Sequence, residues 1–324
     1  MNKLETNKVY IGDCFDVLKT FPSESIDMCI TSPPYWGLRD YGVNTQLGLE
    51  KTPEQFIDKL CDVFDEVKRV LKPNGSCWVN IGDSYHRGTR DSVPKQKGIK
   101  EVGYKYEFNH KKKYGDYYRP KSLIQIPSRF SIEMTNRGWI LRNEIIWHKP
   151  SCLPASVKDR FTVDFEKMFF FTKNPNYYFK QQLEPVKEKS LERAQYSLNQ
   201  TDNPEKAVNV QNMDKMGTRF VNPKGRNKRT VWSINTAKLR DAHFAVYPLE
   251  LLRSPIDAGC PEGGIVLDPF FGSGTTAEVA MEQNKEWVGI EINPEYEKIS
   301  RKRLKPKITE KKQRDLANEF WDTK

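Results

Sequence analysis

The stretch that decides the fold lies near the carboxyl end of the chain and reads Gly264-Ile265-Val266-Leu267-Asp268-Pro269-Phe270-Phe271-Gly272-Ser273-Gly274-Thr275-Thr276. It predicts a buried strand, a glycine-rich turn and the start of a helix. Gly272 and Gly274 lack side chains, so the backbone of the turn can approach a ligand closely. Glu291 follows 23 residues after Asp268, at the tip of the next predicted strand, where a carboxylate can accept hydrogen bonds from both ribose hydroxyls. The stretch therefore predicts a cofactor site at the edge of an α/β sheet.

Two cofactor classes have the shape for such a turn, a dinucleotide and S-adenosylmethionine. No lysine follows the glycines, as a phosphate-binding P-loop requires, and Asp268 would place a negative charge beside a pyrophosphate. A cationic sulfonium with an amino-acid tail tolerates that aspartate. The residues therefore favour S-adenosylmethionine.

Around this stretch the chain alternates short apolar runs with amphipathic segments, which predicts a parallel sheet covered by helices. We expect strands at residues 9–11, 26–31, 76–81, 139–147, 265–267 and 287–290, and helices at 15–18, 127–136, 248–258, 275–284 and from 294. A further helix is expected to begin after Thr52 and to stop at Pro73-Asn74-Gly75. Residues 165–172 and 177–179 are expected to form a hairpin. Residues 181–230 lack apolar periodicity, which indicates an inserted subdomain or a mobile loop.

A second motif, Ile30-Thr31-Ser32-Pro33-Pro34-Tyr35-Trp36-Gly37, directly follows a predicted strand. The prolines fix the backbone and have no amide hydrogens of their own. A serine hydroxyl and a rigid prolyl carbonyl at that strand tip can hold an exocyclic amine, and Tyr35 offers a ring face to a flipped-out base. A proline-rich turn is the alternative interpretation, and Trp36 fits either packing or base stacking.

The net charge of +10 is concentrated in three segments. Residues 85–121, 180–230 and 298–314 carry +7, +5 and +8, so the rest of the chain carries −10. The first segment also interleaves seven aromatic residues with its cations, a mixture that suits a nucleic-acid strand. A solvated loop is the alternative for any one segment.

Other features exclude several classes of protein. No apolar run of about 18 residues is present, which excludes a transmembrane helix. The polar residues 1–10 are unlike a secretory signal and favour an intracellular protein. The six cysteines form no C-x-x-C pair, so we expect reduced thiols and no metal site.

The two motifs together resemble those of the amino-directed DNA methyltransferases of the beta arrangement, in which the catalytic motif precedes the cofactor motif. The resemblance runs from about residue 10 to residue 303 and weakens at 85–121 and 181–230. It implies the Rossmann-like α/β fold of S-adenosylmethionine-dependent methyltransferases, with a mostly parallel sheet, helices on both faces and a permuted order. The implied catalytic loop is Ser32, Pro33, Pro34 and Tyr35. The implied cofactor site consists of Asp268, Pro269, Phe270, Gly272, Ser273, Gly274, Thr275 and Glu291, with Asp13 near the adenine and Phe244 on the methionine side.

The resemblance also implies an organisation for the chain. A catalytic half, residues 1–180, contains the basic aromatic insertion 85–121. It is followed by a target-recognition insertion, 181–230, a cofactor-binding half, 231–304, and a basic tail, 305–324. The implied partner is double-stranded DNA, bound by Lys111, Lys112, Lys113, Arg226, Lys228 and Arg229. A cognate restriction endonuclease is a further candidate partner, and monomer and homodimer both stay open. The implied location is the cytoplasm of a bacterial cell, at the nucleoid, with a bacterial or phage gene as the source.

The expected activity is transfer of a methyl group from S-adenosylmethionine to the exocyclic amine of a flipped base. Serine at the first catalytic position favours cytosine N4, and adenine N6 is the alternative. Methylation of a ring carbon needs a thiolate in a Pro-Cys context, whereas the chain has the reverse order, Cys260-Pro261. A nicotinamide-dependent oxidoreductase would leave residues 31–36 without a role, and a non-catalytic DNA-binding module would leave Glu291 without one. RNA as the substrate stays open.

Overall fold

The computed structural model describes residues 4–37, 46–86, 119–189, 222, 224–237 and 247–322, with only the helical backbone described for residues 310–322. The chain divides into two compact units. The first consists of Met1–Phe179 and Val231–Lys324, and the second of Lys180–Thr230. The candidate site described below lies in the first unit.

The first unit is built on an eight-stranded sheet in the order β1-β10-β9-β2-β3-β5-β4-β8. The strands are β1 (Lys8–Ile11), β2 (Ile26–Thr31), β3 (Leu71–Ile81), β4 (Ile140–His148), β5 (Phe165–Thr172), β8 (Val231–Ser233), β9 (Ile265–Asp268) and β10 (Glu286–Glu291). All neighbours pair in parallel except β5, which is antiparallel to β3 and β4. The late strands β9 and β10 lie between the early strands β1 and β2, so motifs far apart in the sequence meet at one sheet edge.

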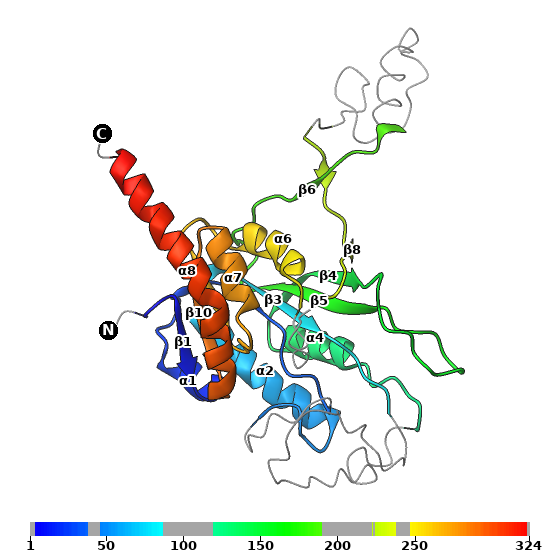
Figure 1. Ribbon diagram of the computed structural model, residues 1–324. Coiled ribbons are helices and arrows are strands. Elements are labelled where there is room, and N and C mark those ends of the chain that lie inside the picture. The colour runs from blue at the N-terminus through cyan, green and yellow to red at the C-terminus, as the bar shows by residue number, and fades with distance from the viewer. Residues whose placement is uncertain are drawn as a thin grey trace. The chain divides into compact units, whose positions relative to one another are not determined.

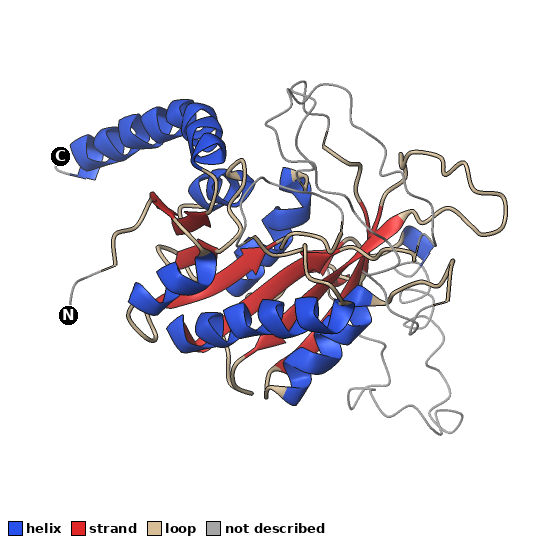
Figure 2. Ribbon diagram, turned by 90° about the horizontal axis from the view of Figure 1, so that it is seen from below, coloured by secondary structure: helices blue, strands red, loops and turns tan. Residues whose placement is uncertain are grey.

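Helices cover both faces of this sheet (Figures 1 and 2). On one face lie α1 (Cys14–Thr20), α2 (Pro53–Val70) and α4 (Ile126–Asn136), and on the other α6 (Leu249–Gly259), α7 (Thr275–Glu282) and α8 (Pro294–Asp322). Each layer has its own apolar core, with Phe64 and Phe130 in the first and Leu252 and Val279 in the second. The predicted α/β fold with helices on both faces is confirmed.

The start of α2 agrees with the sequence prediction, but its end does not. Thr52 is the N-cap, and its hydroxyl oxygen accepts a hydrogen bond from the backbone N–H of Gln55 at 3.2 Å. The helix ends at Val70, and β3 begins at once with Leu71, before the predicted stop. The reason is an irregular pairing in which β2 meets β3 at Leu71 and again only from Ser76 onward. The short turn signal therefore lies inside the strand, in an irregular segment between two stretches of pairing.

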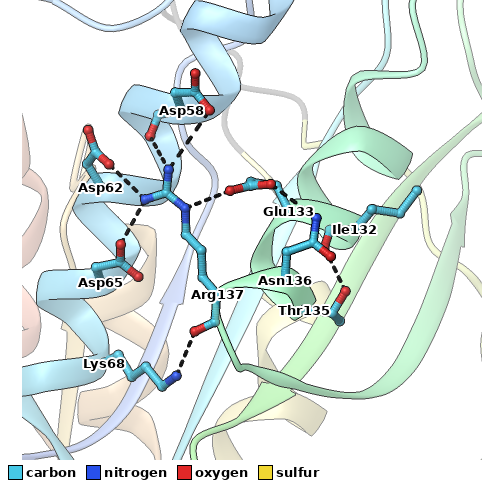
Figure 3. Close-up of polar contacts among 9 residues, drawn as sticks. All are labelled: Asp58, Asp62, Asp65, Lys68, Ile132, Glu133, Thr135, Asn136 and Arg137. Atoms are coloured by element: carbon cyan, nitrogen blue, oxygen red, sulfur yellow. Dashed lines mark hydrogen bonds and ion pairs between the residues drawn. The ribbon is translucent and has the colours of Figure 1, made fainter.

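A cluster of charges around Arg137 connects α2 to the end of α4 (Figure 3). The Arg137 guanidinium donates to Asp62 at 2.7 Å, to Asp65 at 2.8 Å and to Glu133 at 2.9 Å. Lys68 of α2 donates to the backbone oxygen of Arg137 at 2.9 Å. These contacts fix the angle between two helices whose inner faces form the first core.

One further prediction needs correction. Residues 177–179 form no strand, so the predicted hairpin is wrong, because β5 already has β3 and β4 on its two sides. Tyr177 and Phe179 instead pack their rings on Phe170, with centroids 5.6 and 5.7 Å away. Residues 305–322, the predicted basic tail, belong to α8, the helix that was expected to begin at residue 294. Within the described ranges, no helix has both the length and the apolar character that crossing a membrane requires.

In the second unit the described residues contain one small antiparallel pair. Strand β6 (Leu183–Glu184) pairs with β7 (Arg226–Asn227). The Glu184 carboxylate accepts from Arg226 at 2.8 Å and from Arg229 at 2.6 Å. The two ends of this segment are thereby held together.

Candidate active site

The two sequence motifs meet at the carboxyl ends of β2 and β9, which are neighbours in the sheet. A cavity of about 330 Å³ opens there. Of the residues predicted from the sequence, the cavity is lined by Asp13, Ser32, Pro33, Pro34, Tyr35, Pro269, Phe270, Gly272, Ser273, Thr275 and Glu291. The catalytic and cofactor motifs therefore face one space.

Tyr35 is fixed in this cavity by two neighbouring strands. Its hydroxyl donates to Glu166 at the start of β5, with an O–O distance of 2.5 Å. Its ring lies against Gly82, which directly follows β3, and a Cβ on Gly82 would sit 2.6 Å from the ring. The next residue, Trp36, is buried and donates its indole N–H to the backbone oxygen of Glu50 at 3.0 Å. Trp36 therefore packs in the protein and offers no face to a base.

The glycine-rich turn uses its two glycines differently. Both have left-handed φ angles, 53° for Gly272 and 82° for Gly274, which favour glycine. A Cβ on Gly274 would meet Leu304 at 3.1 Å, so this glycine allows close packing, and it does not line the cavity. A Cβ on Gly272 would have only the Phe270 backbone oxygen nearby, at 4.0 Å. Gly272 therefore leaves open space on the ligand side of the turn.

Asp268 lies behind the turn and does not line the cavity. It is 1% exposed, and its carboxylate accepts from the hydroxyls of Thr31 at 2.6 Å, Thr276 at 2.5 Å and Tyr247 at 3.1 Å. Burial raises the pKa of Asp268, and these hydrogen bonds oppose that rise. In this arrangement Asp268 ties the end of β2 to the turn, which positions the two motifs relative to each other.

Glu291, by contrast, reaches the cavity at the tip of β10. One carboxylate oxygen accepts from the Gly272 N–H at 2.8 Å, and the other from the Asn293 N–H at 2.9 Å. Burial raises the pKa of Glu291, and these two backbone donors lower it. Asp13 lies nearby as the N-cap of α1, accepting from the Phe15 N–H at 2.9 Å. Both carboxylates suit a ligand with hydroxyl groups or positive charge.

Further cavity-lining residues were not predicted, among them Asn80, Trp147, Lys149 and Glu166. Lys149 donates to Glu166, and its ammonium lies 4.5 Å from the centroid of the Trp147 ring. Glu166 thus bridges Lys149 and Tyr35. Their positions in the sequence could have indicated these residues. Trp147 and Lys149 lie at or just after the end of a predicted strand, and Glu166 lies near the start of another.

The cofactor turn is also braced from α8. Arg303 donates to the hydroxyl oxygens of Ser273 at 2.9 Å and Thr275 at 3.0 Å, and to the Glu278 carboxylate at 3.0 Å. Ser273 and Thr275 line the cavity, and Arg303 itself does not. Arg303 is therefore a second residue that acts on the site through its neighbours.

The remaining predicted residues lie elsewhere. Phe244 and Lys111 to Lys113 fall outside the described residues. Arg226, Lys228 and Arg229 lie in the second unit, where the two arginines pair with Glu184. All six cysteines are free thiols, and the described ranges hold no His, Cys, Asp or Glu cluster able to bind a metal ion.

Comparison with known families finds a match over most of the chain. Residues 26–302 match the model of the N6_N4_Mtase family, described as DNA methylase. Type II methyltransferase M.Cfr9I of Citrobacter freundii is 39% identical over 303 residues, covering 93% of this chain and 88% of the relative. Type II methyltransferase M.SmaI of Serratia marcescens is 39% identical over 306 residues, covering 94% and 92%.

Solved structures share the fold at lower identity. PvuII DNA methyltransferase (cytosine-N4-specific) superimposes with a TM-score of 0.59 and 21% identity, covering 92% of this chain and 86% of that one. The M1.HpyAVI-SAM complex gives a TM-score of 0.51 and 17% identity, covering 92% and 98%. At these identities the likeness concerns the fold alone.

Proposed function

This chain belongs to the N6_N4_Mtase family of DNA methylases, and on that premise we propose that it methylates the 4-amino group of cytosine at a specific site in double-stranded DNA. The chain is a DNA amino-methyltransferase that uses S-adenosylmethionine. The choice of cytosine rests on the hydroxyl of Ser32. The observation that carries the proposal is one cavity lined by both the Ser32 to Tyr35 loop and the glycine-rich turn.

The cavity has the features that S-adenosylmethionine requires. Gly272 leaves open space against the backbone, where an extended ligand can lie. Each Glu291 oxygen accepts one backbone N–H, which leaves a lone pair on each for a ribose hydroxyl. We infer that Glu291 holds the ribose, that Asp13 approaches the adenine, and that the turn at residues 269–275 supports the amino-acid end. The cofactor, when bound, supplies an electrophilic methyl group on a cationic sulfur.

Ser32 and Pro33 act on the amine of the target base. An aromatic amine is a poor nucleophile because its lone pair is delocalised into the ring. If its two N–H groups donate to the Ser32 hydroxyl and the Pro33 carbonyl, the nitrogen becomes more tetrahedral and its lone pair becomes available. Held in this way by Ser32 and Pro33, the amine would direct its lone pair at the methyl group that the cofactor supplies, and the proton released would pass to water. Tyr35 contributes its ring face, on which a flipped base can stack.

No thiol of the chain is needed for this reaction. Cys260, the residue beside a proline, is buried at the end of α6. Burial raises the pKa of the Cys260 thiol to about 12, so it stays protonated at neutral pH. Attack by a thiolate on a ring carbon is therefore not available to Cys260.

The proposal is tested by expressing the protein in a bacterial host that lacks the modification. Genomic DNA is sequenced with detection of modified bases, and nucleosides are analysed by mass spectrometry after digestion. We expect N4-methylcytosine at one sequence, abolished by Ser32→Ala and retained in Ser23→Ala, which removes an exposed hydroxyl elsewhere. N6-methyladenine alone would contradict the assignment of the base, and unmodified DNA would contradict the proposed activity.

The proposal extends to how DNA is held. Lys111, Lys112 and Lys113 in the basic aromatic insertion would contact phosphates, and residues 181–230, with Arg226, Lys228 and Arg229, would read the sequence. A restriction endonuclease that cuts the same sequence when it is unmodified would be the functional partner. Because the substrate would be the DNA of a bacterial cell, the protein would work in the cytoplasm at the nucleoid.

A further inference from the structure

The loop between β4 and β5, residues 149–164, begins and ends beside the cavity. The backbone N–H of Lys149 donates to the backbone oxygen of Asp164 at 2.7 Å, which closes the loop at its base. Lys149 and Glu166, on the two sides of this closure, both line the cavity. Figure 1 shows the β4–β5 loop extending beyond the end of the sheet. The base of this loop is therefore part of the cavity wall.

The β4–β5 loop exposes an unusual amount of apolar surface. Phe161 is 96% exposed and Leu153 is 90% exposed. Of the eleven large apolar residues that are exposed in the described ranges, five lie between residues 153 and 165. Five exposed apolar side chains within thirteen residues are more than the single ones that a surface ordinarily carries, which indicates that this loop takes part in an interaction.

Polar contacts hold the loop while its apolar side chains stay uncovered. Asp159 pairs with Lys121 at 2.5 Å, and the Arg160 guanidinium lies 3.8 Å from the centroid of the Tyr85 ring. The two residues that directly precede Phe161 make these contacts, so the loop is held there while the Phe161 ring stays exposed. Because this part of the loop is already held, packing the Phe161 ring against a partner would lose little further conformational entropy.

We propose that Phe161 is a wedge residue, which packs against bases of the duplex next to the target and occupies space left when the target base leaves the stack. The inference rests on the proposed function, because it takes DNA as the partner. DNA fits this surface better than a protein does, since Lys149 and Glu166 at the base of the loop line the cavity that would receive the base. An aromatic ring also stacks on any base face, so the contact needs no particular sequence.

The chemistry of base flipping gives the wedge its role. A base in a matched duplex must be unpaired and unstacked before its amine reaches Ser32, and that cost is lower for a mismatched base. A side chain that stabilises the opened duplex should therefore matter most for the matched substrate. This dependence separates a wedge from a residue that only supports the fold.

The experiment compares wild type, Phe161→Ala and Phe161→Trp on two duplexes that carry the sequence found by sequencing of modified genomic DNA. In one duplex the target base is paired, and in the other it faces a mismatch. Single-turnover methylation rates are measured at saturating S-adenosylmethionine. We expect Phe161→Ala to be at least tenfold slower on the paired duplex and within about threefold of wild type on the mismatched one. Phe161→Trp should stay within about threefold on both, and so should the control Ile132→Ala, which truncates a 60% exposed side chain on α4.

Three results would overturn the inference. Equal losses on both duplexes would make Phe161 a structural residue, and unchanged rates on both would make it irrelevant to catalysis. A change in sedimentation of Phe161→Ala without a change in the ratio of the two rates would assign the surface to a second copy of the chain. If wild type methylates neither duplex, the proposed function itself fails, and that outcome is distinct from a defect confined to the variant.

Discussion

Tyr35 shows how the candidate site depends on single contacts made across long distances in the sequence. Its hydroxyl donates to Glu166, 131 residues away, and Glu166 in turn accepts from Lys149. Gly82 supplies the space for the ring, because any side chain there would collide with it. A ring held by its hydroxyl on one side and by bare backbone on the other has little freedom to rotate. We therefore expect Glu166 to act as a positioning residue for Tyr35.

This expectation is tested by a double-mutant cycle. Tyr35→Phe keeps the ring and removes the hydroxyl, and Glu166→Gln removes the negative charge. Each single change should slow methylation about five- to tenfold. A hydrogen bond to a charged group contributes about 1.5–3 kcal/mol, and each variant keeps part of the positioning effect of this contact. The double variant should be no slower than the slower single variant, because both changes break one contact. Glu144→Gln, on β4 and paired with Lys167, is the matched control. Effects that multiply would show that the two residues act independently.

Arg303 allows a prediction about the cofactor turn. Arg303→Met keeps the length of the side chain and removes the donors to Ser273 and Thr275. We expect the Kd of S-adenosylmethionine to rise about five- to tenfold, corresponding to roughly one hydrogen bond of about 1 kcal/mol. The rate at saturating cofactor should change less than about twofold, because a contact equal in ground and transition states affects binding alone. Calorimetric titration measures the Kd, and single-turnover kinetics measure the rate at saturating cofactor.

The control for Arg303 is Arg301→Met, two residues earlier in the same helix. Arg301 is 80% exposed and pairs with Glu297 of its own helix. Its removal should leave cofactor affinity unchanged. Equal losses of affinity in both variants would mean that α8 acts through its general charge rather than through the contacts of Arg303.

At the scale of elements, periodicity and turn chemistry predicted the framework well. The bounds of β2 agree with the prediction because four of its six residues are apolar, which is visible in the sequence, and all six are buried in the structure. The early start of β3 could not be predicted, because Gly75 lies in an irregular segment where a Cβ would sit 3.0 Å from the Asp27 backbone oxygen. This close approach depends on the neighbouring strand β2, so no local sequence pattern indicates it.

The candidate site also has one part that could be predicted from the sequence and one part that could not. The loop after β2, the glycine-rich turn and Glu291 each follow a predicted strand directly, so their meeting at one edge follows from a parallel sheet. Glu166 and Lys149 belong to the antiparallel part of the sheet. Their placement beside Tyr35 depends on β5 lying between β3 and β4, an order that no local pattern encodes.

The contact between α2 and α4 predicts a loss of stability. Arg137→Met removes the donors to Asp62, Asp65 and Glu133 while keeping the apolar stem. These are partly exposed pairs, worth about 0.2–1 kcal/mol each, so we expect the free energy of unfolding to fall by about 1–2 kcal/mol at pH 7. Urea denaturation measures it. Arg142→Met, which removes a surface contact to Tyr177, should cost less than about 0.5 kcal/mol and serves as the control.

The same contact carries a pH dependence. The hydrogen bond from Arg137 lowers the pKa of Glu133 below its usual value of 4.5. A carboxyl whose pKa is lower in the folded state contributes stability above its unfolded pKa, and this contribution is lost as the pH falls through the folded pKa. The difference between wild type and Arg137→Met should therefore be constant from pH 5 to 7 and shrink below about pH 4. An unchanged difference at pH 3.5 would contradict this origin.

At the scale of the whole molecule, the division into two units suggests that recognition and chemistry can be separated. Lys180–Thr230 forms a compact unit of its own, whereas the cavity residues all belong to the other unit. Exchanging residues 180–230 for the corresponding segment of a relative with a different target should transfer the target sequence. Cofactor affinity should stay within about twofold, because no cavity residue changes. Sequencing of modified bases reads the outcome, and a chimera that still modifies the original sequence would place recognition elsewhere.

The distribution of charge makes the last prediction, about affinity for DNA of any sequence. The +20 carried by three segments outweighs the −10 of the rest, so phosphate contacts should concentrate in those segments. Each phosphate contact contributes about 0.9 to the slope of log K against log salt concentration. Changing Lys111 to Lys113 to glutamine should therefore lower the magnitude of the slope by about 2–3 and weaken binding alike on specific and random duplexes. The control is a triple change of lysines that already pair with carboxylates, Lys8, Lys19 and Lys59. Both triple variants remove the same total charge and differ only in where it is removed. If the slope falls equally in both, DNA binding depends on total charge rather than on contacts of the basic insertion.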